Sequence, residues 1–177
     1  MTDQTAGSNG TLRIGRYSVV DGGDIVGITE RNGEMVRLPA WTVIGDHLIL
    51  GAHPADTMPP DVDVIANVDS FRFYDIPNRI LYLHFAYRDA NELPDATDLR
   101  LTATYLNDLR AAGKTVFIHC RLGLNRSALL TGLVLIDEGY GAADAIELMR
   151  TRRGPYVLLN KTFERYLLSQ TPRSATS

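Results

Sequence analysis

The stretch His119-Cys120-Arg121-Leu122-Gly123-Leu124-Asn125-Arg126-Ser127 decides how this chain folds. It follows a short apolar run, residues 115–118, that predicts a buried strand, and it precedes a longer apolar run, residues 127–136, that predicts a helix. The stretch is therefore expected to form a strand-to-helix turn. In such a turn the backbone N–H groups and the start of the helix face one centre, where a phosphate or sulfate ion can bind.

Two side chains in this turn, Cys120 and Arg126, are predicted to carry chemistry. The positive field at a helix N-terminus stabilises a thiolate, which makes Cys120 the expected nucleophile. Arg126 closes the far side of the loop, where its planar fork can hold two phosphoryl oxygens. Ser127 is placed to hydrogen-bond the sulfur, and Gly123 gives the backbone freedom for a tight loop. The predicted phosphate-binding set is Arg121, Leu122, Gly123, Leu124, Asn125 and Arg126.

A histidine followed by Cys-x5-Arg-Ser, between a strand and a helix, resembles the signature of the cysteine-dependent protein tyrosine phosphatase superfamily. The chain is most similar to the dual-specificity branch, over about residues 41–168. The resemblance implies an α/β fold with a mainly parallel central sheet and helices on both faces, in three layers. It also implies a phosphoric monoester hydrolase that needs no metal or cofactor and forms a cysteinyl-phosphate. Its substrates would be phosphotyrosine and, in the dual-specificity case, phosphoserine and phosphothreonine.

A second catalytic group is expected, because the leaving oxygen must be protonated as its bond to phosphorus breaks. In the family this acid is an aspartate on a mobile loop before the long helix, and residues 86–95 match that loop. Asp89 takes the family's position, a few residues past the predicted strand end at Phe85. Glu92 and Asp95 compete for the role, although Asp95 also suits the cap of the following helix.

Four further polar residues, His119, Asn125, His47 and His53, need an interpretation. His119 should face away from the site and hold the loop by hydrogen bonds to the backbone, with a direct role as a base less favoured. The water molecule that hydrolyses the cysteinyl-phosphate is expected to be positioned by Asn125, or by Asp89 acting as a base after it has given up its proton. His47 and His53 raise the question of a metal, but they belong to a strand and a loop with no third histidine nearby, so no metal site is predicted.

Composition narrows the function further. The chain has 177 residues and a net charge of −3, which fits one domain and argues against a nucleic-acid or anionic-membrane partner. Its single cysteine excludes an internal disulfide and suits a reactive thiol in a reducing compartment. No apolar run reaches the ~18 residues of a membrane span, and no signal-peptide pattern is present. We expect a cytoplasmic protein phosphatase whose partner is a phosphorylated protein or peptide.

The order of elements predicts one domain, residues 11–170, between disordered ends at 1–10 and 171–177. Residues 11–39 should form a β-ribbon that a core phosphatase does not need, and residues 40–170 the catalytic core. Two apolar runs, 62–68 and 80–85, suit inner strands of a covered sheet. The expected helices follow Asp95 or Thr97, start at Ser127, run over 144–152 and begin after Asn160.

Other functions fit the same residues. The stretch Gly123-Leu124-Asn125-Arg126 also resembles the loop of metal-independent RNA 5′-triphosphatases, and phosphoinositide phosphatases share the scaffold. A phosphate-binding module without catalysis, or a sulfur-transfer protein of the rhodanese type, would also carry such a loop. The simplest alternative is a structural cysteine on a core strand with an unrelated surface arginine.

Overall fold

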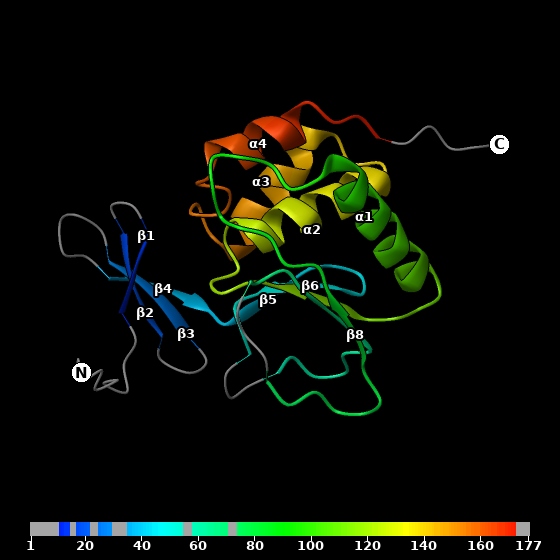
Figure 1. The fold of residues 1–177 in the computed structure, drawn as a ribbon, viewed down its shortest axis with the longest axis horizontal. Coiled ribbons are helices and arrows are strands. Elements are labelled where there is room, and N and C mark those ends of the chain that lie inside the picture. Colours follow the sequence, from blue (N-terminus) through cyan, green and yellow to red (C-terminus); the bar gives the residue numbers. More distant parts are fainter. Residues whose placement is uncertain are drawn as a thin grey trace, which may run out of the picture.

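The computed structural model describes residues 11–14, 17–21, 25–29, 35–54, 58–70 and 74–172. The described strands form two separate sheets, and the described helices gather above the larger of them (Figure 1). The predicted disordered start, residues 1–10, and all but the first two residues of the predicted disordered tail, residues 171–177, lie outside the described residues.

The smaller sheet is an antiparallel meander that stands beside the core in Figure 1. Its strands are β1 (Thr11–Ile14), β2 (Tyr17–Asp21), β3 (Ile25–Thr29) and β4 (Met35–Pro39). All of them lie within the β-ribbon expected over residues 11–39, and β1 pairs with β2 in the register Thr11 to Val20. The end of β4 reaches the core, where Leu38 is buried.

The larger sheet confirms the predicted α/β class with mainly parallel strands. It contains β5 (Trp41–Gly45), β6 (Leu48–Gly51), β7 (Val64–Asn67), β8 (Leu81–His84) and β9 (Val116–His119), in the order β5-β6-β9-β7-β8. Strands β5 and β6 form an antiparallel hairpin, and all other neighbours are parallel. The parallel strands therefore end together, with Gly51 and Asn67 both in register with His119.

One predicted inner strand is an edge strand. The run 80–85 was expected inside the sheet, but β8 has only β7 as a neighbour, and Leu81 is 40% exposed. The chain leaves β8 for the first helix and returns through β9, which inserts between β6 and β7. No described strand is left to cover the far side of β8.

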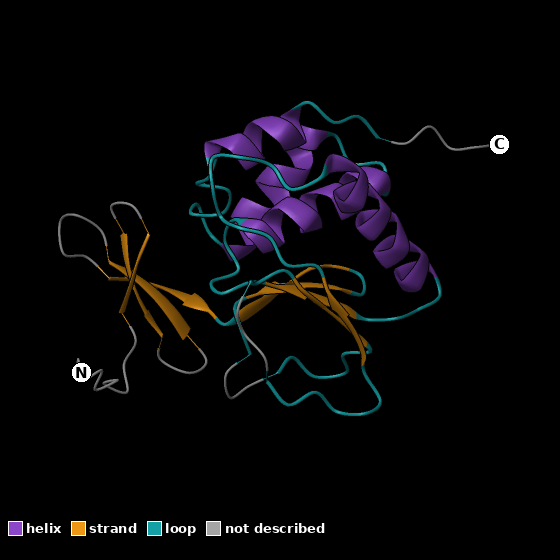
Figure 2. Cartoon of the chain, viewed as in Figure 1, coloured by secondary structure: helices purple, strands orange, loops and turns teal. Residues whose placement is uncertain are grey.

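The helices are α1 (Ala96–Ala111), α2 (Arg126–Asp137), α3 (Ala142–Arg153) and α4 (Lys161–Leu168). Figures 1 and 2 show all of them on one face of the core sheet, with irregular segments below it. The prediction of helices on both faces therefore fails for the described residues. The connection from β6 to β7 contains Pro54, Pro59 and Pro60, which prevent a helix there. A small second core, formed by Ile49, Val62, Ile65, Ile80 and Phe117, closes this face instead.

Helix α2 lies at the centre of the larger core and is buried on nearly every side, as its apolar sequence predicted. At Gly132 an added Cβ would lie 2.6 Å from Leu167 of α4, so the two helices approach closely. The loop that precedes α2 is consequently attached to the most buried helix of the fold. No helix of the described residues is long and apolar enough to cross a membrane.

Candidate active site

The anion loop, residues 120–125, connects the end of β9 to the start of α2, as the sequence predicted. It packs directly against the end of β6. Gly123 has φ +69, and a Cβ there would lie 2.4 Å from the carbonyl carbon and oxygen of Gly51. Only glycine fits this position, because both the backbone angle and the space exclude a side chain.

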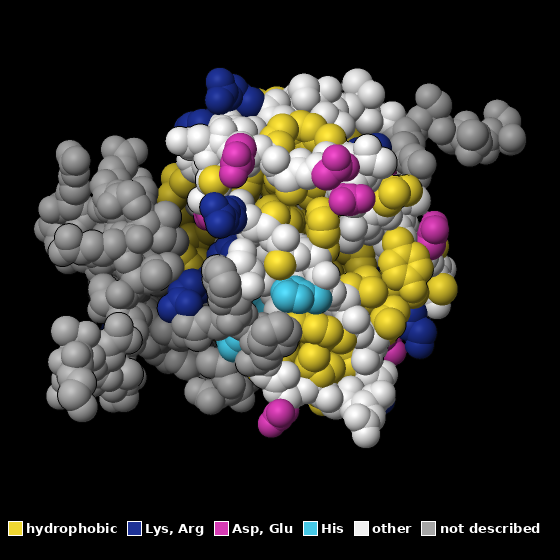
Figure 3. Space-filling view, viewed as in Figure 1, with side chains coloured by type: hydrophobic (Ala, Val, Ile, Leu, Met, Phe, Trp, Pro, Cys, Tyr) yellow, Lys and Arg dark blue, Asp and Glu magenta, His cyan; other side chains and the backbone are white. Residues whose placement is uncertain are grey.

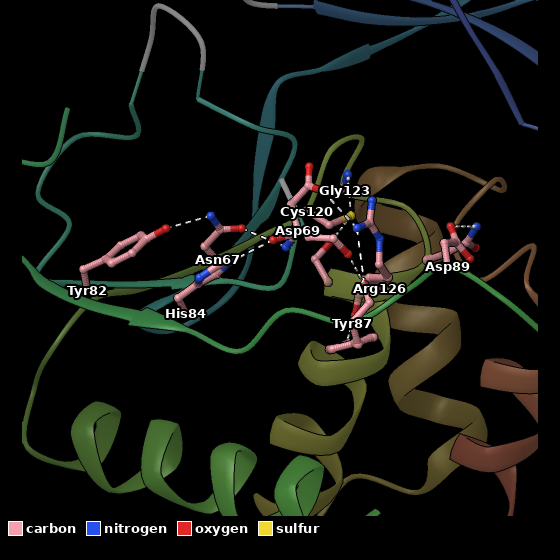
Figure 4. Close-up of polar contacts among 12 residues, drawn as sticks. Asn67, Asp69, Tyr82, His84, Tyr87, Asp89, Cys120, Gly123 and Arg126 are labelled. Carbon is pink, nitrogen blue, oxygen red and sulfur yellow. Dashed lines mark hydrogen bonds and ion pairs between the residues drawn. The ribbon is translucent and has the colours of Figure 1, made fainter. Parts of the chain in front are cut away.

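Cys120 points its sulfur into the loop and is only 3% exposed. The Gly123 N–H donates to Sγ over 3.3 Å, and Ser127 Oγ lies 3.2 Å from Sγ. Figure 4 shows the sulfur beside the Gly123 nitrogen and the Arg126 guanidinium. A sulfur with two such neighbours has donors ready for a negative charge.

The guanidinium of Arg126 is hydrogen-bonded through Nη1, whereas its Nε has no hydrogen-bond partner among the described residues. Its Nη1 donates to Asp69 Oδ1 over 3.0 Å and to the Tyr87 carbonyl over 3.4 Å. Its Nε is buried and makes no hydrogen bond within the described part of the chain. Burial by itself would lower the pKa of Arg126, but the negative charges of Cys120 and Asp69 outweigh it and raise the pKa. A charged donor is therefore presented next to the sulfur.

Asp69 is the functional neighbour that the sequence did not reveal. It follows β7, is 4% exposed, and forms a buried ion pair with Arg126. Its backbone is fixed on both sides: its N–H donates to Asn67 Oδ1 over 2.8 Å, and its carbonyl accepts from His84 Nε2 over 2.9 Å. Asn67 in turn donates to the Tyr82 hydroxyl, so the contacts run from β8 to Arg126 (Figure 4). No local signal in the sequence pointed to this contact, because Asp69 reaches the anion loop only through the pairing of β7 with β9.

Asp89 lies on the loop before α1, on the Arg126 side of the site in Figure 4. Each of its carboxylate oxygens accepts from a side-chain amide at 2.9 Å, Oδ2 from Asn125 and Oδ1 from Asn160. Its competitor Asp95 is occupied as the cap of α1, where its side chain accepts from two backbone N–H groups. Glu92 is exposed on the same loop.

His119 faces the opposite side of the sheet from the helices, as strand alternation predicted. Its ring stacks on Phe117, and its Nε2 shares a 2.6 Å hydrogen bond with the Tyr74 hydroxyl. Burial lowers the pKa of His119 to about 3, the charge of His53 lowers it further, and a backbone hydrogen bond at Cys120 opposes both. The imidazole is therefore neutral at physiological pH.

Arg153, at the end of α3, supports the loop from behind and was also missed. It is 2% exposed and donates to the carbonyls of Leu122 and Gly123 over 3.0 and 2.7 Å. A trans peptide points its N–H away from its C=O, so the contact with the Leu122 carbonyl favours the orientation in which the Gly123 N–H faces the sulfur. Burial lowers the pKa of Arg153 to about 10, against the opposing charge of Cys120, which leaves it protonated at neutral pH.

Leu122, Leu124 and Asn125 complete the loop as buried residues, and Arg121 is half-buried. All of the loop residues predicted from sequence are thus brought to one place, together with Ser127 and Asp89. No cluster of three or more His, Cys, Asp or Glu side chains that could hold a metal ion occurs among the described residues.

An α/β fold with a cysteine and an arginine on one strand–loop–helix, next to an aspartate, defines the class of cysteine-dependent phosphatases. The chain matches the catalytic domain of dual specificity phosphatases over residues 54–171, and it belongs to that family.

The similar proteins differ in how much of them this chain covers. A Caenorhabditis elegans RNA/RNP complex-1-interacting phosphatase homolog is 33% identical over 79 residues, which are 43% of this chain and 34% of that protein. This chain thus spans about a third of that relative. A mouse putative dual specificity phosphatase complexed with zinc tungstate superposes with TM-score 0.67 at 18% identity, over 73% of this chain and 84% of that one. Human DUSP28 superposes with TM-score 0.66 at 20% identity, over 73% and 90%. These structures share the fold.

Proposed function

We propose that this protein hydrolyses phosphate monoesters on proteins, with phosphotyrosine as the main substrate, through a cysteinyl-phosphate intermediate. The observation that carries the proposal is the guanidinium of Arg126. Its Nη1 is fixed by Asp69, its buried Nε has no hydrogen-bond partner in the described residues, and the guanidinium lies beside the Cys120 sulfur (Figure 4). A buried donor without a partner is costly, and a bound oxyanion would satisfy it.

In the first step the Cys120 thiolate attacks phosphorus opposite the leaving oxygen. The sulfur–phosphorus bond forms as the phosphorus–oxygen bond breaks, and Asp89 gives its proton to the leaving oxygen. Arg126 and the loop N–H groups bind the three equatorial oxygens, where charge accumulates. The Gly123 N–H, which donates to Sγ over 3.3 Å, is one such loop group and supports this arrangement.

In the second step a water molecule attacks the phosphorus of the cysteinyl-phosphate. Asp89, now a carboxylate, takes a proton from the water, and the sulfur leaves as a thiolate. Ser127 Oγ, 3.2 Å from Sγ, donates to the departing sulfur. Inorganic phosphate is released, and Cys120 returns to its starting state. His119 is given no role in proton transfer, because its ring stacks on Phe117 and its Nε2 is hydrogen-bonded to the Tyr74 hydroxyl.

The choice of phosphoprotein substrates rests on the family and on the acid. An aspartate beside the loop suits monoesters with poor leaving groups, such as tyrosine and serine side chains. A lone reactive cysteine suits a reducing compartment, so we place the activity in the cytoplasm.

The experiment compares phosphate release by the parent protein and by Cys120→Ser from phosphotyrosine, phosphoserine and phosphothreonine peptides. The parent should hydrolyse the phosphotyrosine peptide fastest. Cys120→Ser should release no phosphate but retain the peptide, with an unchanged thermal midpoint as evidence that it folds. Turnover by Cys120→Ser would refute the cysteinyl-phosphate mechanism.

An RNA 5′-phosphatase activity is the second candidate, because the loop sequence Gly123-Leu124-Asn125-Arg126 resembles that class and one relative's name refers to RNA. A 5′-triphosphorylated RNA oligonucleotide and a phosphoinositide are therefore assayed beside the peptides. Faster release from either one than from phosphotyrosine would reassign the substrate while leaving the roles of Cys120 and Arg126 intact.

A further inference from the structure

The segment between α3 and α4, residues 154–160, is bound to the anion loop at two points. The Leu158 N–H donates to the Leu124 carbonyl over 2.8 Å, and the Asn160 N–H donates to Asn125 Oδ1 over 3.0 Å. Leu158 is fully buried at φ +60, a backbone conformation that is unfavourable for a residue other than glycine. Surrounding packing must impose this conformation, so the segment has a fixed position relative to the loop.

Asn160 uses both ends of its side-chain amide. Its Oδ1 accepts from the N–H groups of Thr162 and Phe163 over 3.0 and 3.3 Å and caps α4. Its Nδ2 donates to Asp89 Oδ1 over 2.9 Å and to the Ala90 carbonyl over 2.8 Å. Because only the oxygen can accept from the helix, the NH₂ group is obliged to face the Asp89 loop.

Asn125 completes the arrangement from the anion loop. It occupies the N-cap position of α2 but makes no side-chain cap bond there. Its Nδ2 donates instead to Asp89 Oδ2 over 2.9 Å, and its Oδ1 accepts from the Asn160 N–H. Each carboxylate oxygen of Asp89 is thus held by one side-chain amide, and the backbone N–H of Asn160 joins its residue to the Asn125 side chain.

The Asp89 side chain needs these hydrogen bonds to keep one orientation, because Asp89 is exposed on a loop. An exposed aspartate can adopt several rotamers, whereas a general acid must lie within hydrogen-bond reach of the leaving oxygen. We infer that Asn160, with Asn125, is a positioning residue that holds the Asp89 carboxylate at the anion loop. The inference rests on the proposed function, in which Asp89 protonates the leaving group.

The test uses variants of Asn160 that keep the helix cap and lose the amide donor. Serine and aspartate both cap helices well, so Asn160→Ser and Asn160→Asp should keep the thermal midpoint within about 2 °C. Asn160→Ser leaves Asp89 Oδ1 without its donor. Asn160→Asp also sets a carboxylate against a carboxylate, so its loss of activity should be larger.

The readout is kcat on a series of aryl phosphates that runs from p-nitrophenyl phosphate to phenyl phosphate. A basic leaving group depends most on the acid, so Asn160→Ser should lower kcat for phenyl phosphate about tenfold and for p-nitrophenyl phosphate far less. In the Asp89→Ala background, Asn160→Ser should change kcat by less than about twofold, because the two residues act as one unit.

An equal loss for every leaving group, or the same loss with and without Asp89, would show that Asn160 only maintains the structure. If Asp89→Ala hydrolyses phenyl phosphate at the parental rate, the acid assignment and this inference both fail. The Cys120→Ser comparison decides the proposed function separately, since it does not involve Asp89 or Asn160.

Discussion

At the scale of single residues, the ion pair between Asp69 and Arg126 sets the direction of the guanidinium. Asp69→Asn removes the charge but keeps the size, so Arg126 should lose its fixed orientation. Because a misplacement of about 1 Å can cost 10²-fold, we expect kcat/KM for an aryl phosphate to fall roughly 100-fold. Steady-state kinetics and binding of tungstate, an oxyanion of similar shape, measure the effect.

The matched control is Asp75→Asn, the same change at an exposed site on the same connection between β7 and β8. It should leave kcat/KM unchanged. Equal kinetics for Asp69→Asn and the parent would mean that Arg126 needs no help from Asp69.

His119 gives a prediction about pH and stability. Its pKa is lowered to about 3 by burial, against an ordinary value of 6.5, so the unfolded chain binds the extra proton first. The contribution of neutral His119 to the free energy of unfolding is therefore fully present above about pH 6.5. It is lost as the pH drops toward 3, by at most about 1.4 kcal/mol per pH unit. His119→Asn should remove this slope, and urea unfolding at pH 7 and pH 4 measures it.

The exposed His47 provides the comparison for that experiment, because asparagine tolerates its positive φ of 56. His47→Asn should keep the parental dependence on pH between 7 and 4. A parental slope in His119→Asn would assign the acid sensitivity to other groups.

At the scale of elements, the anion loop depends on how closely it packs against the end of β6. Gly123→Ala would place a Cβ 2.4 Å from the Gly51 backbone and 2.6 Å from Arg153 Nη2. Neither the β6 backbone nor Arg153 can move freely, since Arg153 holds the carbonyls of the same loop. We expect a loss of about 2 kcal/mol or more in stability, together with loss of oxyanion binding.

Gly113→Ala separates the clash from the backbone strain. Gly113 has φ +78, close to that of Gly123, but nothing lies within 4 Å of an added Cβ. It should cost only the strain of the backbone angle and leave activity unchanged. If both variants lose the same stability and both remain active, the close approach of β6 is not needed for the site.

At the scale of the whole molecule, the two sheets raise the question of what the N-terminal one contributes. Figure 3 shows one face of the molecule, on which the described apolar, basic, acidic and histidine side chains are mixed. The end of β4 makes contacts that join this sheet to the core. Leu38 packs in the core, and the Pro39 carbonyl accepts from Arg153 over 3.1 Å.

A chain that starts at residue 35 should therefore fold and keep the parental kcat/KM for a small aryl phosphate. A chain that starts at residue 41 should be less stable, because Leu38 and an acceptor of the buried Arg153 are lost. Thermal unfolding and kinetics of the two truncated chains measure the difference. Loss of activity in the longer one would make the N-terminal sheet part of the catalytic unit.

Much of the fold could be predicted from sequence because its signals are local. The strand before Cys120, the helix after Arg126 and the cap at Asn160 each follow from a pattern within a few residues. The mostly apolar run from Ala128 to Ile136 predicted a helix buried on most sides, and α2 is such a helix. The edge position of β8 and the single layer of helices could not be predicted, because they depend on strand order and on which connections form helices.

The sequence by itself determined the loop with Cys120, Arg126 and Ser127, since one continuous turn carries all of them. Only the tertiary structure brought Asp69, Arg153 and Asn160 to that turn. Asp69 lies 57 residues before Arg126 in the sequence, and Asn160 lies 35 residues after Asn125. Their contacts join different strands and helices, and the number of residues between two elements does not predict how close they lie in space. A buried charge or amide finds its partner only when packing has closed around it, so the residues that orient the site became visible only in the fold.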